Sequence, residues 1–159
     1  MCGLARFTSL VLSLEVHSFI IYHESIISVK YLETYLRHLT TMRRTDKKID
    51  NNVRKALTIA CDTALESVDG FKWLTHTASY DCFPGSLLVV CVFGTNEMLD
   101  KAREDEIEAV FRRLIQGNLL KVGVKFKHVQ KQVRFDTEED CERENDGNWK
   151  ERIANYKPL

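Results

Sequence analysis

Apolar residues recur at every third or fourth position between residues 46 and 68, and this spacing predicts an amphipathic helix that lies on a core. Asp46 can cap the start of the helix, and Asp69-Gly70 offers a left-handed stop after its end. The apolar stripe consists of Ile49, Val53, Ala56, Leu57, Ala60, Ala64, Leu65 and Val68.

Two extended runs follow the helix, at residues 71–80 and 87–93. Pro84-Gly85 suits the centre of a tight turn, so the runs predict an antiparallel hairpin. The second run has no polar face, and we therefore expect it to be buried on both sides at the centre of the sheet. In the first run, alternation predicts that Phe71 and Trp73 share one face of the strand, with Tyr80 on the other.

A second helical stripe covers residues 107–119, with Gly123 as a candidate stop. The charged residues before it, up to Glu106, are typical of a solvated loop or a first helical turn. Residues 132–135 alternate as a strand does, and Thr137 has the spacing of a capping residue for a short helix after Asp136. Trp149 and Ile153 then predict a final helical turn that closes the core.

The order of these elements is α-β-β-α-β-α, which predicts a compact α+β domain whose small sheet has a central hairpin covered by helices. The 118 residues from Met42 to Leu159 are enough for a self-sufficient core, so we expect one domain over 42–159. Residues 1–41 carry only six charged side chains, against forty in the rest of the chain. We interpret them as an N-terminal extension that arises from a misplaced start at Met1, with a genuine helical extension as the alternative.

Composition excludes several classes of protein. The 23 basic and 23 acidic residues balance, which argues against a strongly basic nucleic-acid binder. The five cysteines form no CxxC pair and are typical of free thiols in the cytoplasm. Charged and polar residues interrupt the apolar stretch at 7–22, so we expect no stable membrane insertion. Phosphate-loop and dinucleotide fingerprints are absent, and we expect no cofactor.

Two groups of basic residues lie on either side of the predicted hairpin in the sequence. If they converge in space, they could follow the phosphates of a nucleic acid; otherwise they are exposed charges that keep the protein soluble. The nine candidate nucleic-acid-binding residues are Arg43, Arg44, Lys47, Lys48, Arg54, Lys55, Lys125, Lys127 and Lys131.

Acidic residues are dense after the last strand, and Asp136, Glu138 and Glu139 are weak candidates for metal ligands. Acids at the start of a helix are an ordinary stabilising signal, and we favour that interpretation, with Asp136 as a capping residue. His76 and Cys82 could form a nucleophilic pair, but no third, orienting residue stands at a recognisable spacing. We therefore predict a hydrogen-bonded strand histidine and no catalytic residue.

Five segments together resemble a family of short, uncharacterised bacterial proteins, some of which carry a Fis-type transcriptional-regulator label. The resemblance covers most of residues 42–159 and implies a bacterial cytosolic regulator, without transferring any catalytic residue. The segments are KKIDNNVRKAL (47–57), GFKWLTH (70–76), FPGSLLVVCVF (83–93), VRFDTEEDC (133–141) and GNWKERIA (147–154).

These observations predict a non-catalytic cytoplasmic binding or regulatory module, with nucleic acid as the first candidate partner. A module that binds another protein is the alternative. A metal-dependent hydrolase that uses Asp136, Glu138 or Glu139 is the third hypothesis.

Overall fold

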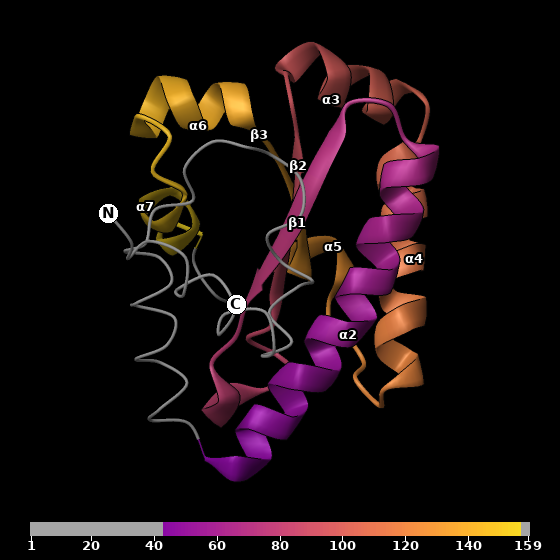
Figure 1. Ribbon diagram of the computed structural model, residues 1–159, viewed down its shortest axis with the longest axis vertical. Coiled ribbons are helices and arrows are strands. Elements are labelled where there is room, and N and C mark those ends of the chain that lie inside the picture. Colours follow the sequence, from indigo (N-terminus) through magenta and orange to yellow (C-terminus); the bar gives the residue numbers. More distant parts are fainter. Residues whose placement is uncertain (1–42, 157–159) are drawn as a thin grey trace, which may run out of the picture.

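The longest apolar stripe of the chain forms helix α2 (Arg44–Ser67), which lies along one side of a three-stranded sheet in the computed structural model (Figure 1). The structure describes residues 43–156, so the predicted extension at 1–41 lies outside it. The helix begins two residues earlier than predicted. Asp46 is not its cap: its carboxylate binds the Arg43 guanidinium at 3.1 Å within the first turn.

The predicted hairpin is confirmed as strands β1 (Phe71–Thr77) and β2 (Leu88–Phe93), which pair antiparallel. Strand β3 (Val133–Thr137) runs parallel to β2, and the sheet order β1-β2-β3 places β2 at the centre. Every residue of β2 is buried, as its unbroken apolar sequence predicts.

Pro84 and Gly85 lie in a hydrogen-bonded turn, as predicted, but the connection between β1 and β2 is longer than a tight turn. It contains a short 3-10 helix, η1 (Tyr80–Cys82), before Pro84 and Gly85. The Ser86 hydroxyl donates to the Ser79 carbonyl at 2.6 Å and accepts from the Ser79 amide at 3.1 Å. These two bonds close the base of a longer loop, which we call the hairpin loop (residues 78–87).

The helices that come after β2 in the described chain complete the α+β fold that the sequence predicts. Of the two alternatives for the charged segment after β2, the helical one agrees with the structure: the segment forms helix α3 (Asn96–Glu104), and the Thr95 hydroxyl caps it by accepting from the Met98 amide. Thr137 caps α6 in the same way, as its spacing predicts. These helices are α3 (Asn96–Glu104), α4 (Ile107–Lys121), α5 (Val129–Gln132), α6 (Glu138–Asn145) and α7 (Trp149–Ala154).

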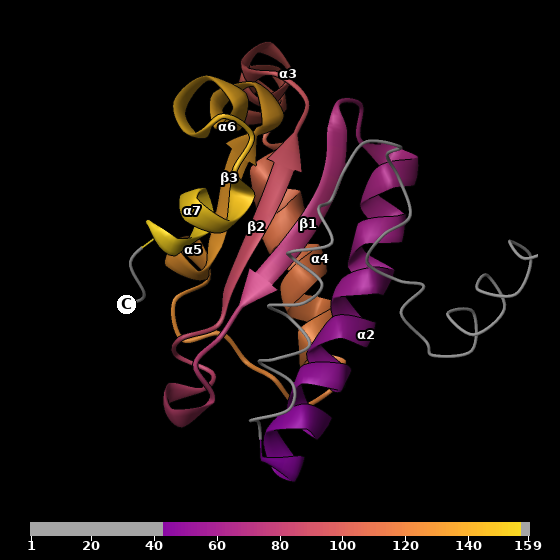
Figure 2. The same ribbon diagram turned by 60° about the vertical axis from the view of Figure 1, so that its left-hand side comes forward.

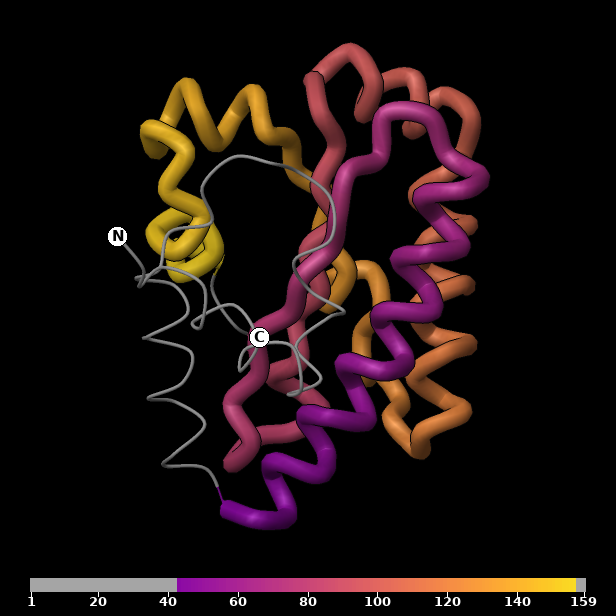
Figure 3. The backbone as a smooth tube through the Cα atoms, in the orientation of Figure 1, coloured from indigo at the N-terminus to yellow at the C-terminus, as the bar shows by residue number. Residues whose placement is uncertain are grey.

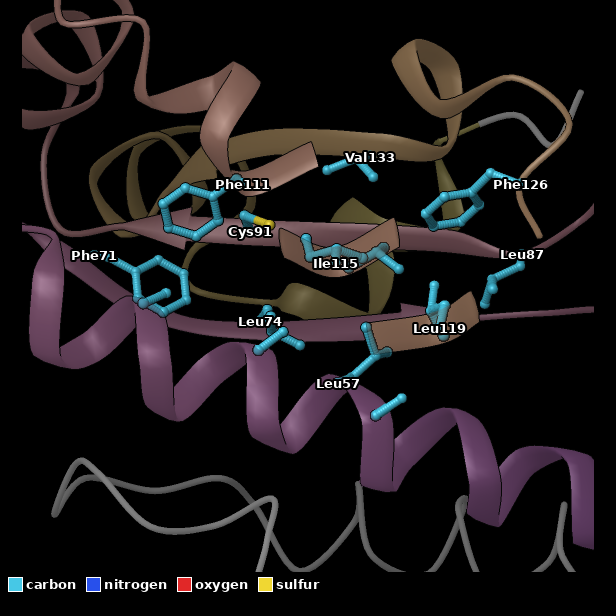
Figure 4. Close-up of a cluster of buried hydrophobic side chains, with 14 of the residues drawn as sticks. Leu57, Phe71, Leu74, Leu87, Cys91, Phe111, Ile115, Leu119, Phe126 and Val133 are labelled. Atoms are coloured by element: carbon cyan, nitrogen blue, oxygen red, sulfur yellow. The ribbon is translucent and has the colours of Figure 1, made fainter. Parts of the chain in front are cut away.

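Helices α2 and α4 cover one face of the sheet, where the main core lies (Figure 2). Figure 4 shows Phe71, Leu57 and Ile115 among the side chains that fill it. The ring of Phe111 in α4 lies 4.9 Å from the ring of Phe71 in β1, so α4 and β1 contribute side chains to the same cluster.

A bulge in β1 overturns the prediction that Phe71 and Trp73 share a face. The pairing register shifts by one residue between them, which sends their side chains to opposite sides of the sheet. Trp73 therefore packs on the second face, with its ring 4.7 Å from that of Trp149. The predicted last helical turn thus closes a second, smaller core around Val90 and Val92.

Candidate functional site

The two predicted basic segments lie at the same end of the sheet as the hairpin loop. Tyr80 follows β1 and donates a hydrogen bond of 2.5 Å to Asp50 of α2, which places the start of α2 beside this loop. Arg43 extends the contact through an ion pair with Asp81 at 2.5 Å. Lys127 approaches the same loop from the other side, because β3 and the residues before it run parallel to β2.

Gln132 joins the hairpin loop to the turn that carries Lys127. Its side-chain amide donates to the carbonyls of Pro84 and Leu87 at 2.8 and 2.9 Å. Its carbonyl oxygen accepts from the backbone amides of Lys127 and His128 at 2.8 and 2.9 Å. Gln132 is only 2% exposed, so one buried side chain fixes two surface segments that are some forty residues apart in sequence.

A shallow hollow of about 260 Å³ opens between these two segments. The side chain of Lys127 reaches across it, since a methyl group added to Gly85 would lie 3.5 Å from the Lys127 ammonium nitrogen. The hollow is thus bounded by a flexible cation on one side and by backbone on the other. Its lining residues are Cys82, Gly85, Ser86, Lys127 and His128.

Charge is strongly segregated along the molecule although the totals balance. We call the end formed by residues 43–55, 78–87 and 121–131 the basic end, because it carries ten basic and three acidic side chains. The opposite end, which we call the acidic end, comprises residues 62–69, 96–108 and 138–146 and carries fifteen acidic and three basic side chains. Figure 3 follows the backbone between the two ends, with α2 spanning them.

Not all nine candidate basic residues contribute equally to the basic end. Arg54 binds the buried Asp50 carboxylate at 2.7 Å, and burial lowers the pKa of its guanidinium. Arg43 is bound by two carboxylates. The candidates for which the described residues provide no carboxylate within 4 Å are Arg44, Lys47, Lys48, Lys55, Lys125, Lys127 and Lys131.

Of these seven, three lie on the outer face of α2. Arg44, Lys48 and Lys55 share a helical stripe opposite the residues that face the core. Lys125, Lys127 and Lys131 are exposed, with Lys127 beside Gly85 of the hairpin loop, and Lys47 in the first turn of α2 is partly buried. The structure therefore brings the two predicted segments to one end of the molecule, where each of them contacts the hairpin loop.

Asp50 is the centre of a buried polar cluster beneath the basic end. The imidazole of His76 lies 3.2 Å from its carboxylate, which confirms the predicted hydrogen-bonded strand histidine. Burial, and then the hydrogen bond to Asp50, raise the pKa of the Tyr80 hydroxyl. Because Asp50 is 5% exposed and meets three partners, we assign this cluster to fixing the position of α2 on the sheet.

Asp136 is bound by Arg152 and does not cap a helix. The guanidinium donates to the two carboxylate oxygens at 2.5 and 2.7 Å, and the Tyr156 hydroxyl donates to one of them. The hydrogen bond to Asp136 raises the pKa of Arg152, whereas burial, and then the same carboxylate, raise the pKa of Tyr156. The prediction that Asp136 is a capping residue is therefore wrong; Thr137 caps α6 instead.

The other two metal candidates also have protein partners. Glu138 accepts a hydrogen bond from the indole of Trp73 at 3.1 Å, and Glu139 accepts from the backbone amide of Asn96 at 2.8 Å. Within residues 43–156, no three His, Cys, Asp or Glu side chains lie where they could hold one metal ion. These acids join α6 to β1 and α3, so their contacts are structural.

The cysteines of the described chain differ in their accessibility. Burial raises the pKa of the thiols of Cys61 and Cys91, and it raises that of Cys141 to about 11. Cys82 is exposed at the rim of the hollow. Among residues 43–156 no two cysteines are joined by a disulfide.

Sequence analysis missed three residues that organise the structure. Gln132 and Asp50 are polar residues that belong to no recognisable motif. Arg152 lies in a short helix whose sequence is typical of a solvent-exposed segment. A polar residue at an apolar position of a helical stripe, as Asp50 is between Ile49 and Val53, is the one clue that pattern analysis could have used.

No protein-family model, no curated protein and no solved structure matches this chain. Of the helices between residues 43 and 156, none is both long enough and apolar enough to cross a bilayer. Function is therefore inferred from the geometry of the basic end.

Proposed function

We propose that the protein is a non-catalytic binding module whose basic end binds the phosphate backbone of a nucleic acid. The observation that carries the proposal is the convergence of segments 43–55 and 121–131 on the hairpin loop, which concentrates cations at one end of a neutral protein. Lysines that neutralise phosphates release bound counterions, and this release drives association. A regulatory role in a bacterial cytoplasm, which the Fis-type resemblance implies, is part of this proposal.

Lys127 is the residue that we expect to contribute most to binding. Its ammonium group lies over the hollow, and the backbone beneath it is held by the two hydrogen bonds to Gln132. A cation on a fixed backbone loses less conformational freedom on binding than one on a mobile loop. The acidic end would repel the same ligand, so only one end of the molecule is suited to it.

Fluorescence anisotropy with a labelled DNA duplex and a labelled single strand, each at several salt concentrations, tests the proposal. With about four phosphates neutralised, the logarithm of the association constant should fall with the logarithm of salt concentration with a slope of about −4 for duplex DNA. Lys127→Glu should weaken binding to all sequences and reduce the slope by about 1. Lys101→Glu, at the acidic end, is the matched control and should leave binding unchanged.

Undetectable binding at low salt, or equal effects of the two substitutions, would reject the proposal and favour the alternative of a protein-binding module. The metal-dependent hydrolase receives no support from this geometry, because the three candidate carboxylates already bind Arg152, Trp73 and Asn96.

A further inference from the structure

The outer face of α2 carries a stripe of side chains that point away from the core. Successive members are separated by four, three, four, three and four residues, which is the spacing of a seam between two packed helices. Five of the six are exposed, and the sixth, Asn52, is partly buried. We call them the α2 seam: Lys48, Asn52, Lys55, Ile59, Asp62 and Glu66.

The seam combines unpaired charges with an exposed apolar side chain. Among the described residues, none of the four charged members has an ion-pair partner within 4 Å. Ile59, near the middle, is 54% exposed, more than any other large hydrophobic residue of residues 43–156. The face therefore has charge and apolar surface that the described part of the fold does not use.

The order of charge along the seam identifies its partner. The first half is basic, with Lys48 and Lys55, and the second half is acidic, with Asp62 and Glu66. The spacing reads the same in both directions, so a second α2 laid antiparallel brings each seam residue opposite another seam residue. We propose that the α2 seam is a self-complementary surface on which a second copy of this chain docks, with the two α2 helices antiparallel.

In this arrangement the two-fold axis crosses the seam level with residue 57, midway between Lys48 and Glu66. Lys48 faces the partner's Glu66 and Asn52 faces the partner's Asp62, and each contact occurs twice. The apolar stem of Lys55 lies on the partner's Ile59. A parallel pair would set lysine against lysine and acid against acid, so charge selects the antiparallel orientation.

A single helix pair is a smaller contact than the roughly 1,600 Å² of a standard interface, and its two Lys48–Glu66 ion pairs are exposed to solvent. We therefore expect a reversible dimer whose population rises with protein concentration and falls with salt. The inference does not rest on the proposed function, because the seam includes only two of the basic residues of the basic end, Lys48 and Lys55, and no residue of the hollow takes part. A nucleic acid would compete with the second copy only for Lys48 and Lys55.

A charge exchange tests the interface in the full chain of 159 residues, in buffer free of nucleic acid. Sedimentation equilibrium should show a mass that rises above the monomer value with concentration at low salt. Glu66→Lys alone, and Lys48→Glu alone, should each return the mass to that of a monomer. The double variant K48E/E66K should restore dimerisation, because it reverses the polarity of both pairs.

The rescue has one structural explanation. Residues 48 and 66 are about 27 Å apart along the helix, at 1.5 Å per residue, so they cannot interact within one chain. Both side chains are exposed, and circular dichroism should confirm that all three variants keep the helical content of the wild type and unfold cooperatively. A monomer at every concentration, or a double variant as monomeric as either single one, would overturn the proposal.

Disulfide formation gives a second and more sensitive measurement, in a background with Cys2→Ser and Cys82→Ser. Lys48→Cys and Glu66→Cys combined in one chain should crosslink into a dimer on mild oxidation, since the antiparallel pair brings these positions together twice. Each single cysteine variant should not crosslink, because positions 48 in the two copies lie about 27 Å apart. Crosslinking of either single variant, or none of the double variant, would contradict the antiparallel interface.

Discussion

Replacing Gln132 by leucine should destabilise the protein and loosen the basic end at the same time. The substitution keeps roughly the volume of the side chain but removes the bonds that it makes on both sides. Five backbone groups lose a hydrogen bond, namely the carbonyls of Pro84, Gly85 and Leu87 and the amides of Lys127 and His128.

The magnitude depends on which of these groups can find water. The bond to the Leu87 carbonyl is buried, whereas the others are partly buried and lie near the hollow. A buried polar group left without a partner costs about 1–3 kcal/mol. With one group fully orphaned and the others partly rehydrated, we expect Gln132→Leu to lower the free energy of unfolding by about 3 kcal/mol.

Urea denaturation followed by circular dichroism measures this loss, and Gln130→Leu is the matched control. Gln130 lies in the same short helix but is more exposed, so its substitution should change stability by less than about 0.5 kcal/mol. Gln132→Leu should also weaken nucleic-acid binding, because Lys127 would no longer stand on a fixed backbone. Equal stability of the two variants would refute the reasoning.

Gln132→Glu adds a pH test of the same bonds. An ionised carboxylate can accept from the Lys127 and His128 amides but cannot donate to the Leu87 carbonyl, whereas a protonated one can do both. The folded state should therefore bind a proton more tightly than the unfolded state, and the pKa of the introduced carboxyl group should rise above its unfolded value of about 4.3. Relative to the wild type, the variant should lose stability as pH rises from about 4 through this raised pKa.

Other predictions concern the rest of the fold. Arg152→Ala should lower the free energy of unfolding by about 3–5 kcal/mol in urea denaturation, because it leaves the buried Asp136 carboxylate without its guanidinium; a loss below about 1 kcal/mol would show that water replaces the pair. Peptide mapping after brief alkylation at neutral pH should find Cys91 and Cys141 unmodified in the native protein and modified in denaturant, and rapid native labelling would contradict their burial. Deletion of residues 1–41 should leave thermal stability intact, as the composition break predicts, and aggregation of the shortened chain would show that the extension is needed.

The sequence correctly predicted the elements in which the whole strand, or one whole face of a helix, is buried. The apolar run of β2 could lie only at the centre of a sheet, and the stripe from Ile49 to Val68 could face only a core. Both conclusions depend on the free energy of removing apolar surface from water, and the contributions of successive residues to this free energy are roughly additive. Such patterns can be found without knowing which elements become neighbours.

The predictions were wrong where a single residue, or a partner distant in sequence, determines where a side chain lies and what it binds. A single bulge in β1 reversed the face of Trp73, and periodicity carries no signal for it. Arg54 was counted with the exposed cations, but Asp50 binds it at 2.7 Å. Asp136 looked like a cap from its neighbours, whereas its partner Arg152 stands sixteen residues later.

Sequence analysis named the candidate basic residues but not their arrangement in space. Composition alone could group the basic residues into two segments, yet their meeting depends on the parallel pairing of β3 with β2 and on the buried Gln132. Net charge hid the segregation, because fifteen acids gather at the opposite end. The topology, which a single sequence does not reveal, therefore places the basic and acidic residues of a neutral chain at opposite ends of the molecule.

Nuclear magnetic resonance titration with a short single-stranded DNA tests most directly whether the basic end is the binding surface. We expect shifts of backbone amide signals in residues 43–48, 78–87 and 125–131, which disappear at high salt. Signals from α3 and α6 should stay in place. Shifts centred on α3 and α6, or no shifts at low salt, would contradict the assignment of binding to the basic end.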